Sequence, residues 1–244
     1  MRRKEWFGEW FDSPYYHVLY KHRDNEEAKY FLDNLIGLLK PPPCTEMLDL
    51  ACGKGRHSIY LSQKGYNVTG LDLSAQNIAA AKKFENGSLH FDTHDMREVY
   101  AKETFDYIFN LFTSFGYFDT MKEHEDTILS ISTMLRPGGR FVLDFLNPYR
   151  VTHHLVHEEI KRIDGIEFHI NRDVEGDFIV KNIELFDNGN RFEFHEKVRT
   201  ICRAEFLEFF EKAGLRVEFV FGNYELDDYD PERSDRLIFV TQKL

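Results

Sequence analysis

The sequence lacks the features that mark membrane, secreted and disulfide-rich proteins. None of its 244 residues form an apolar run approaching the ~18 residues that a membrane-spanning helix needs. The basic start at residues 1–4 is followed by interspersed acids, which no signal peptide contains. Only three cysteines occur, Cys44, Cys52 and Cys202, far apart and without metal-ligand spacing. We therefore expect a cytoplasmic protein with no membrane partner.

Basic residues are too few for a surface that follows a phosphate backbone. The 31 Lys and Arg residues are outnumbered by 42 Asp and Glu residues, so the net charge is −11. Because nucleic-acid binding depends on clustered Lys and Arg, we expect no nucleic-acid partner. Phenylalanine is abundant at 23 residues, and the chain is long enough to bury a sizeable core.

The stretch MLDLACGKGRH at residues 47–57 is the most informative part of the chain. A short apolar run containing Asp49 indicates a buried strand, and Gly53 and Gly55 follow at a spacing of two. Glycine has no Cβ, so its backbone can turn tightly and a ligand can lie directly against it. The helix expected after Gly55 directs its free amides and positive dipole end at that ligand.

A second acid, Asp72, ends the next expected strand at residues 67–73. It lies about 20 residues beyond the glycines, where a carboxylate accepts hydrogen bonds from a ribose diol. The order of strand, glycine turn, helix, strand and acid predicts a parallel sheet. Such a sheet binds an adenosine-containing molecule at the carboxyl ends of its strands.

These features resemble the motifs of the class I S-adenosylmethionine-dependent methyltransferases. The matching markers occur in the family's order: Asp49, Gly53, Gly55, Asp72, Asp95, residues 105–111 and residues 135–141. They span residues 45–147. The segment TSFGYF at residues 113–118 looks like that of a bacterial subgroup of small methyltransferases with an inserted hairpin sheet. We expect this segment to line the acceptor pocket.

The resemblance implies an α/β fold with a doubly wound, seven-stranded, mostly parallel sheet of the Rossmann-like methyltransferase type, its last strand antiparallel. It implies S-adenosyl-L-methionine as cofactor and S-adenosyl-L-homocysteine as product. The methyl group would go to an N or O atom of an unidentified small molecule. No NPPY-type run follows the fourth strand, as it does in relatives that methylate base or amide nitrogens. This absence and the acidic charge favour a small-molecule methyl acceptor.

The same resemblance implies which residues bind the cofactor. Asp72 would hold the ribose, Asp95 and Met96 the adenine, and Tyr16 would belong to an N-terminal segment that closes over the site. Arg23 could pair with the carboxylate of the cofactor's methionine part. The full expected set is Tyr16, Arg23, Asp49, Ala51, Cys52, Gly53, Gly55, Asp72, Leu73, Asp95, Met96, Asn110 and Leu111. Two alternatives stay open: the N-terminal aromatics pack a helix onto the sheet, and Asp95 caps a helix.

No motif for a general base is present. Methyl transfer mainly requires the nucleophile to lie ~3 Å from the methyl group with water excluded. A base matters when the nucleophile is a protonated amine or an alcohol. His17, His22 and Tyr117 lie in segments expected near the pocket, and the sequence does not choose among them.

Residues 150–199 depart from the α/β pattern. Three runs, at residues 166–170, 178–186 and 191–198, alternate apolar and polar residues with a period of two. This alternation is typical of half-buried antiparallel strands, so we expect an inserted three-stranded antiparallel β-meander. The methyltransferase core would then be residues 1–149 and 200–244, with an N-terminal helical lid at residues 1–40. The meander would roof the acceptor pocket or supply a dimer contact, so the chain is a monomer or a homodimer.

Three histidines, His153, His154 and His157, precede the meander. No carboxylate or cysteine completes a recognised metal spacing, and we expect no metal site.

Two other functions fit part of the pattern. A nicotinamide-dependent oxidoreductase on a Rossmann fold is disfavoured because Ser58 stands at the third glycine position and because such a site has no use for Asp49. A non-catalytic protein that binds S-adenosylmethionine would keep the same acids, since these concern binding and not turnover.

Overall fold

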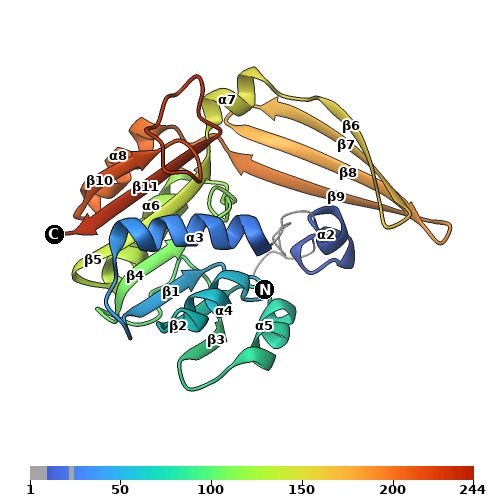
Figure 1. Cartoon of the computed structure of the whole chain (residues 1–244). Helices are drawn as coiled ribbons and strands as arrows, with labels where there is room; N and C mark the ends of the chain where they lie inside the picture. Colours follow the sequence, from blue (N-terminus) through green and yellow to red (C-terminus); the bar gives the residue numbers. More distant parts are fainter. Residues whose placement is uncertain (1–9, 22–24) are drawn as a thin grey trace.

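The computed structural model describes residues 10–21 and 25–244 and confirms the α/β class (Figure 1). Its main sheet comprises β1 (Glu46–Leu50), β2 (Asn67–Asp72), β3 (Leu89–Thr93), β4 (Phe105–Asn110), β5 (Leu135–Leu146), β10 (Leu215–Phe221) and β11 (Arg236–Lys243). The seven strands are ordered β10-β11-β5-β4-β1-β2-β3. β11 runs opposite to the other six strands and pairs antiparallel with β5 and β10, which confirms the expected antiparallel last strand.

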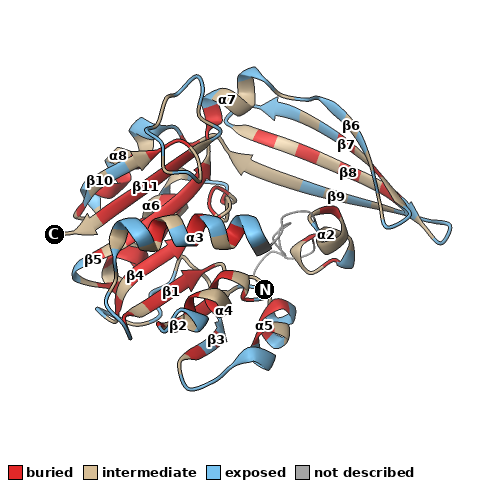
Figure 2. Ribbon diagram, viewed as in Figure 1, coloured by how far each residue is buried: buried red, intermediate tan, exposed pale blue. Residues whose placement is uncertain are grey.

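Helices cover both faces of this sheet (Figure 1). One face carries α3 (Asn25–Leu39), α4 (Arg56–Gln63) and α5 (Ala75–Ala81), and the other carries α6 (Met121–Met134) and α8 (Arg203–Lys212). Two short helices, η1 (Lys82–Phe84) and α7 (Pro148–His153), follow α5 and β5. Because both faces are covered, β1 and β4 are buried almost throughout, and β5 is buried over residues 141–145 (Figure 2).

Gly55 allows the helix after β1 to pack closely on the sheet. It precedes α4 with a φ of 84°, in the left-handed region that favours glycine. A Cβ at this position would lie 2.5 Å from the ring of Phe91 in β3. The second glycine of the predicted turn is therefore needed for close contact between α4 and the sheet.

The insertion is a separate sheet of four antiparallel strands, and the prediction of three strands was wrong. It consists of β6 (Glu158–Ile163), β7 (Ile166–Glu175), β8 (Phe178–Asp187) and β9 (Asn190–Arg199). The missed strand, β6, lies at the edge of the sheet, and its Ile160 is 60% exposed. Because this edge strand buries few apolar side chains, its sequence does not alternate apolar and polar residues. Backbone pairing with β7 holds β6 in the sheet.

The N-terminal helix α2 (Pro14–Leu19) packs on this inserted sheet and not on a helix of the core. Trp10 and Leu19 are buried against apolar side chains of β7 and β8. The Glu196 carboxylate in β9 accepts hydrogen bonds from Trp10 Nε1 at 2.6 Å and from the Tyr20 hydroxyl at 2.5 Å. Lys181 Nζ lies 3.3 Å from the same carboxylate. Figure 1 shows α2 between the inserted sheet and α5.

The carboxylate of Glu196 holds α2 to the inserted sheet, and its removal should destabilise the protein. We expect Glu196→Ala to lower the free energy of unfolding by about 3 kcal/mol, because a largely buried charge pair and two hydrogen bonds lose one partner. Urea unfolding followed by tryptophan fluorescence measures this loss. Glu193→Ala is the matched control, since Glu193 in β9 is 55% exposed and should change stability by less than about 0.5 kcal/mol. Equal losses in the two variants would contradict this role of Glu196.

Candidate functional site

A cavity of about 310 Å³ lies at the carboxyl ends of β1, β2 and β4. Its floor comes from the turn after β1 and from the tip of β2, and its sides come from the segments after β3 and β4. Four residues of the N-terminal segment around α2 complete it: Phe11, Tyr16, His17 and Tyr20. Open α/β sheets bind ligands at this edge, so the cavity is the candidate active site.

The turn after β1 is held from below by a buried carboxylate. Asp49 is 1% exposed and accepts hydrogen bonds from the backbone N–H of Ser58 at 3.0 Å and from its hydroxyl at 2.6 Å. Burial raises the pKa of Asp49 to about 6, and the two Ser58 bonds oppose this shift. Asp49 therefore fixes α4 to the end of β1, and it does not line the cavity.

The upper surface of the same turn faces the cavity. Ala51 and Gly53 have φ values of 63° and 58°. A Cβ added to Gly53 would have no atom within 4 Å, so this part of the backbone borders open space. A ligand can lie directly on it.

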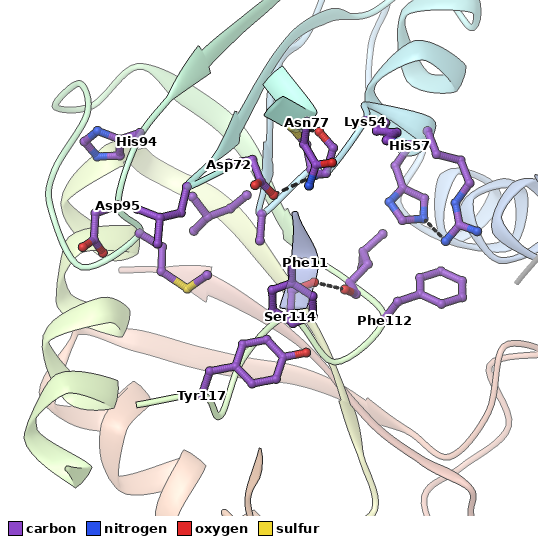
Figure 3. Close-up of a pocket in the computed structure, with 18 of the residues that line it drawn as sticks. Phe11, Lys54, His57, Asp72, Asn77, His94, Asp95, Phe112, Ser114 and Tyr117 are labelled. Carbon is purple, nitrogen blue, oxygen red and sulfur yellow. Dashed lines mark hydrogen bonds between the residues drawn. The ribbon is translucent and has the colours of Figure 1, made fainter. Parts of the chain in front are cut away.

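Asp72 lies at the tip of β2 and is tied to the glycine turn. Its Oδ2 accepts the backbone N–H of Gly53 at 2.8 Å, and its Oδ1 accepts that of Ser74 at 2.8 Å. The Asn77 side chain also contacts this carboxylate (Figure 3). Burial raises the pKa of Asp72, and these hydrogen bonds oppose the rise. Each carboxylate oxygen has a second lone pair, so the group can still accept hydroxyl donors of a sugar.

Apolar side chains continue the cavity beyond Asp72. Leu73, which is 44% exposed, and Met96 both line it. Asp95, which precedes Met96, forms a salt bridge with Arg97 at 2.7 Å. The Asp95 carboxylate also accepts the Arg97 backbone N–H at 3.0 Å. Asp95 thus caps a turn and not a helix, and this part of the cavity suits a flat, mostly apolar ring system.

Aromatic rings form the wall opposite the glycine turn. The centroids of Phe11 and Tyr16 are 5.0 Å apart, those of Tyr16 and Tyr20 are 4.9 Å apart, and those of Phe11 and Tyr117 are 5.4 Å apart. The Tyr117 hydroxyl donates to the carbonyl of Thr113 at 2.5 Å. These rings carry no formal charge, and three of the four come from α2 and the residues beside it.

Two histidines and a cysteine bring titratable groups to the cavity. Burial lowers the pKa of His17, and the nearby Lys54 adds to this effect while Asp12 opposes it. Burial lowers the pKa of His57 to about 3. Burial also raises the pKa of the Cys52 thiol well above its usual range. At pH 7 both imidazoles are neutral, and the thiol is protonated and unsuited to act as a nucleophile.

The structure brings most of the residues expected from the sequence to this one cavity: Tyr16, Ala51, Cys52, Gly53, Asp72, Leu73, Asp95, Met96 and Leu111. Three others support it without lining it. These are Asp49 and Gly55, described above, and the fully buried Asn110, whose Nδ2 donates to the carbonyl of Leu50 at 3.0 Å. Arg23 and His22 lie outside the residues that the structure describes.

Several lining residues did not stand out in the sequence: Lys54, Arg56, His57, Asn77, His94, Arg97 and Phe112. Phe112 is the second residue after the end of β4, and Asn77 lies one helical turn after Ser74. Their proximity to motif residues was the signal that could have identified them. By contrast, residues 113–118 do contribute Ser114, Tyr117 and Phe118, as expected.

Within residues 10–21 and 25–244, no group of three or more His, Cys, Asp or Glu side chains could hold a metal ion. His153 stacks on Tyr149 with a centroid separation of 4.0 Å, and His157 contacts the backbone and side chain of β7. The described part of the chain also contains no helix that is long and apolar enough to cross a membrane.

Comparison with known proteins gives a consistent class. Residues 47–139 match the family model described as a methyltransferase domain. The dTDP-3-amino-3,4,6-trideoxy-alpha-D-glucopyranose N,N-dimethyltransferase of Streptomyces venezuelae is 28% identical over 192 residues, covering 75% of this chain and 80% of that protein.

Two solved structures share the fold along nearly the whole chain. An S-adenosylmethionine-dependent methyltransferase from Clostridium acetobutylicum has a TM-score of 0.80 at 19% identity, covering 94% of this chain and 96% of that one. CalS10, an amino pentose methyltransferase from Micromonospora echinaspora solved with S-adenosylmethionine bound, has a TM-score of 0.70 at 22% identity, covering 95% and 98%.

The matches identify residues 47–139 as a methyltransferase domain and support a class I S-adenosylmethionine-dependent methyltransferase. The two solved structures show that the whole chain has the fold of such enzymes. The nicotinamide-dependent alternative finds no support in these matches.

The shifted pKa of Asp49 predicts a pH-dependent stability. The folded protein, with its pKa of about 6 against an ordinary 3.8, holds this proton more tightly than the unfolded chain does. The contribution of Asp49 to the free energy of unfolding therefore falls as the pH rises from about 4 to about 6. We expect the stability of Asp49→Asn relative to wild type to rise by up to about 3 kcal/mol over this range. Urea unfolding at several pH values measures the difference, and a constant difference would contradict the shifted pKa.

Replacing Asp72 should weaken binding of the cofactor product. We expect Asp72→Ala to reduce the affinity for S-adenosylhomocysteine by about 1–3 kcal/mol, because a hydrogen-bonded carboxylate is removed. Isothermal titration calorimetry measures the affinity. Asp92→Ala is the matched control, because Asp92 is an exposed carboxylate on the neighbouring strand β3. An unchanged affinity of Asp72→Ala would reject its role at the ribose.

Proposed function

We propose that this enzyme transfers the methyl group of S-adenosylmethionine to the amino nitrogen of a small molecule, and that the acceptor is an amino sugar. The observation that carries this proposal is the uncharged aromatic wall of Phe11, Tyr16, Tyr20 and Tyr117 opposite the glycine turn.

The residues around the cavity fit the cofactor. Asp72 would accept hydrogen bonds from the ribose hydroxyls, and Leu73 and Met96 would contact the adenine ring. The open backbone at Gly53 would take the methionine part, with Leu111 at its side. When bound, the cofactor supplies an electrophilic methyl group on a positively charged sulfur. These are the roles expected from the sequence, and the location of the residues around one cavity supports them.

The aromatic wall favours an amine as the acceptor. The faces of aromatic rings attract cations, and both a sulfonium and an ammonium group are cationic. Four rings also displace water from the space where the nucleophile must approach, and orientation without water lowers the barrier to transfer. An uncharged wall that binds cations is suited to a nitrogen acceptor that arrives protonated.

His17 can accept the proton that such an acceptor must lose. Its imidazole is neutral at pH 7, since burial lowers its pKa, and it lines the cavity. The ammonium group would first give a proton to His17, which frees the nitrogen lone pair. This lone pair would then form the bond to the methyl carbon as the carbon–sulfur bond breaks and its electron pair stays on sulfur. The positive charge would pass from sulfur to the methylated nitrogen. An alcohol is a much weaker acid than an ammonium group, and an imidazole is a poor base for it.

The sugar class of the acceptor is supported by a relative. The Streptomyces venezuelae protein acts on an amino sugar linked to dTDP, according to its name, and this chain covers 80% of its length. Residues 113–118, which we expected to line an acceptor pocket, contribute Ser114, Tyr117 and Phe118 beside the aromatic wall.

An assay with paired acceptors tests the proposal. The purified protein is incubated with S-adenosylmethionine and amino sugars, free and dTDP-linked, or with the same sugars carrying a hydroxyl in place of the amine. We expect release of S-adenosylhomocysteine and methylated amine with the amino sugars alone, detected by mass spectrometry. The rate should rise with pH as the acceptor's ammonium group loses its proton.

Methylation of the hydroxyl compounds at the same rate would overturn the choice of nitrogen. Binding of S-adenosylhomocysteine without turnover of any acceptor would favour the non-catalytic alternative. A preference for free over dTDP-linked sugars would locate the acceptor among simple amino sugars.

A further inference from the structure

A strained turn forms part of the cavity wall directly after β4. Phe112 and Thr113 have φ values of 57° and 59°, in the left-handed region that residues with side chains rarely adopt. For the β-branched Thr113 this conformation is a genuine outlier, and such strain persists only where surrounding contacts enforce it. Phe112 and Ser114 both line the cavity, so the conformation of this turn sets the position of the wall.

The contacts that enforce the turn converge on Asp144, a fully buried residue near the end of β5. Its Oδ2 accepts the backbone N–H of Phe112 at 2.7 Å. Its backbone carbonyl accepts the N–H of Thr113 at 3.1 Å. Both N–H groups of the turn are thus bound by a single residue on the neighbouring strand.

Arg236, the first residue of β11, completes the arrangement. Its Nε donates to Asp144 Oδ1 at 2.7 Å, and its terminal NH2 donates to the Thr113 hydroxyl at 2.8 Å. The planar guanidinium therefore contacts the carboxylate and the turn at the same time. A lysine has one compact ammonium group and does not offer this forked geometry.

Tyr224 supports the same network from the side. Its hydroxyl donates to Asp144 Oδ2 at 3.2 Å, and its ring lies 5.2 Å from that of Phe112. Burial raises the pKa of Tyr224, and the Asp144 carboxylate adds to this rise. The phenol is consequently a neutral donor at pH 7. The Phe112 ring also stacks on His57 with a centroid separation of 5.1 Å, so the network extends to a second lining residue.

We propose that Arg236 and Asp144 are positioning residues that hold the Phe112–Thr113 turn in its left-handed conformation. Neither residue lines the cavity. A buried ion pair is costly to desolvate, and apolar residues would fill the same space at no loss of stability. Among the residues that the structure describes, Phe112 and Thr113 are the one pair of consecutive left-handed residues that borders the cavity. The ion pair contacts this pair directly, which gives it a role in the site.

A second ion pair in the same sheet provides a matched control. Arg140 Nε lies 2.6 Å from Glu218 Oε2, joining β5 to β10. Its side chains are 29% and 16% exposed, against 20% and 0% for Arg236 and Asp144. In the sheet, Arg140 lies opposite Gln242, near the end of β11 that is far from Arg236. Neither Arg140 nor Glu218 lines the cavity.

The test compares Arg236→Met with Arg140→Met, using S-adenosylhomocysteine as the probe. Affinity is measured by calorimetry at a temperature where circular dichroism shows both variants folded. We expect Arg236→Met to bind the probe roughly tenfold more weakly, in the range found for residues that touch neither ligand. Arg140→Met should bind the probe within about twofold of the wild-type affinity, even if its melting temperature falls as much as that of Arg236→Met.

Two milder variants separate positioning from folding. Arg236→Lys keeps the charge but not the fork, so its affinity should lie between those of wild type and Arg236→Met. Thr113→Val removes only the hydroxyl that Arg236 contacts. It should weaken binding of the probe by about threefold, which is half of the change in binding free energy expected for Arg236→Met. Combined with Arg236→Met, Thr113→Val should add nothing further, because the contact is already lost.

Equal losses of affinity in Arg236→Met and Arg140→Met would overturn the proposal. If Arg236→Met does not fold, unchanged affinity in both Arg236→Lys and Thr113→Val would overturn it as well. The probe needs no acceptor, so these outcomes are independent of the proposal that the enzyme methylates an amino sugar.

Discussion

The tie between Asp49 and Ser58 is the interaction on which the site depends. It joins the last part of β1 to the first turn of α4 through a carboxylate that water does not reach. Since the chain between them must then close within a few residues, the backbone at Ala51 and Gly53 is forced into left-handed conformations. The N–H of Gly53 is in turn directed at Asp72. One buried acid thus orders the floor of the cavity without facing it.

The opposite wall is positioned by a different part of the chain. The aromatic rings in and beside α2 line the cavity. They are held there because Glu196 of the inserted sheet accepts hydrogen bonds from Trp10 and Tyr20. Contact with the core is more limited and includes a hydrogen bond from the Ser74 hydroxyl to Asp12. The inserted sheet is therefore part of the site, although the cavity contains none of its residues. The inserted sheet supports α2, and its expected role as a roof of the acceptor pocket or as a dimer contact stays a prediction.

The sequence was informative where the functional residues are neighbours along the chain. Asp49, Gly53 and Asp72 fall within one strand–turn–helix–strand unit, whose geometry is set by local rules. It was uninformative where partners are distant. Arg236 and Asp144 are 92 positions apart, and each alone is an ordinary charged residue in a strand. The strand β6 was missed because its side chains bury too little to leave a periodic pattern.

The separation between Trp10 and Glu196, 186 positions, has a consequence for how the enzyme is made. A ribosome releases the N-terminal segment long before the strand that must receive it. Contacts so remote along the chain carry a high entropic cost and form late in folding. The βαβ unit with its glycine turn can close early, from local contacts. The glycine turn can therefore form before the strand that receives the N-terminal segment has been made.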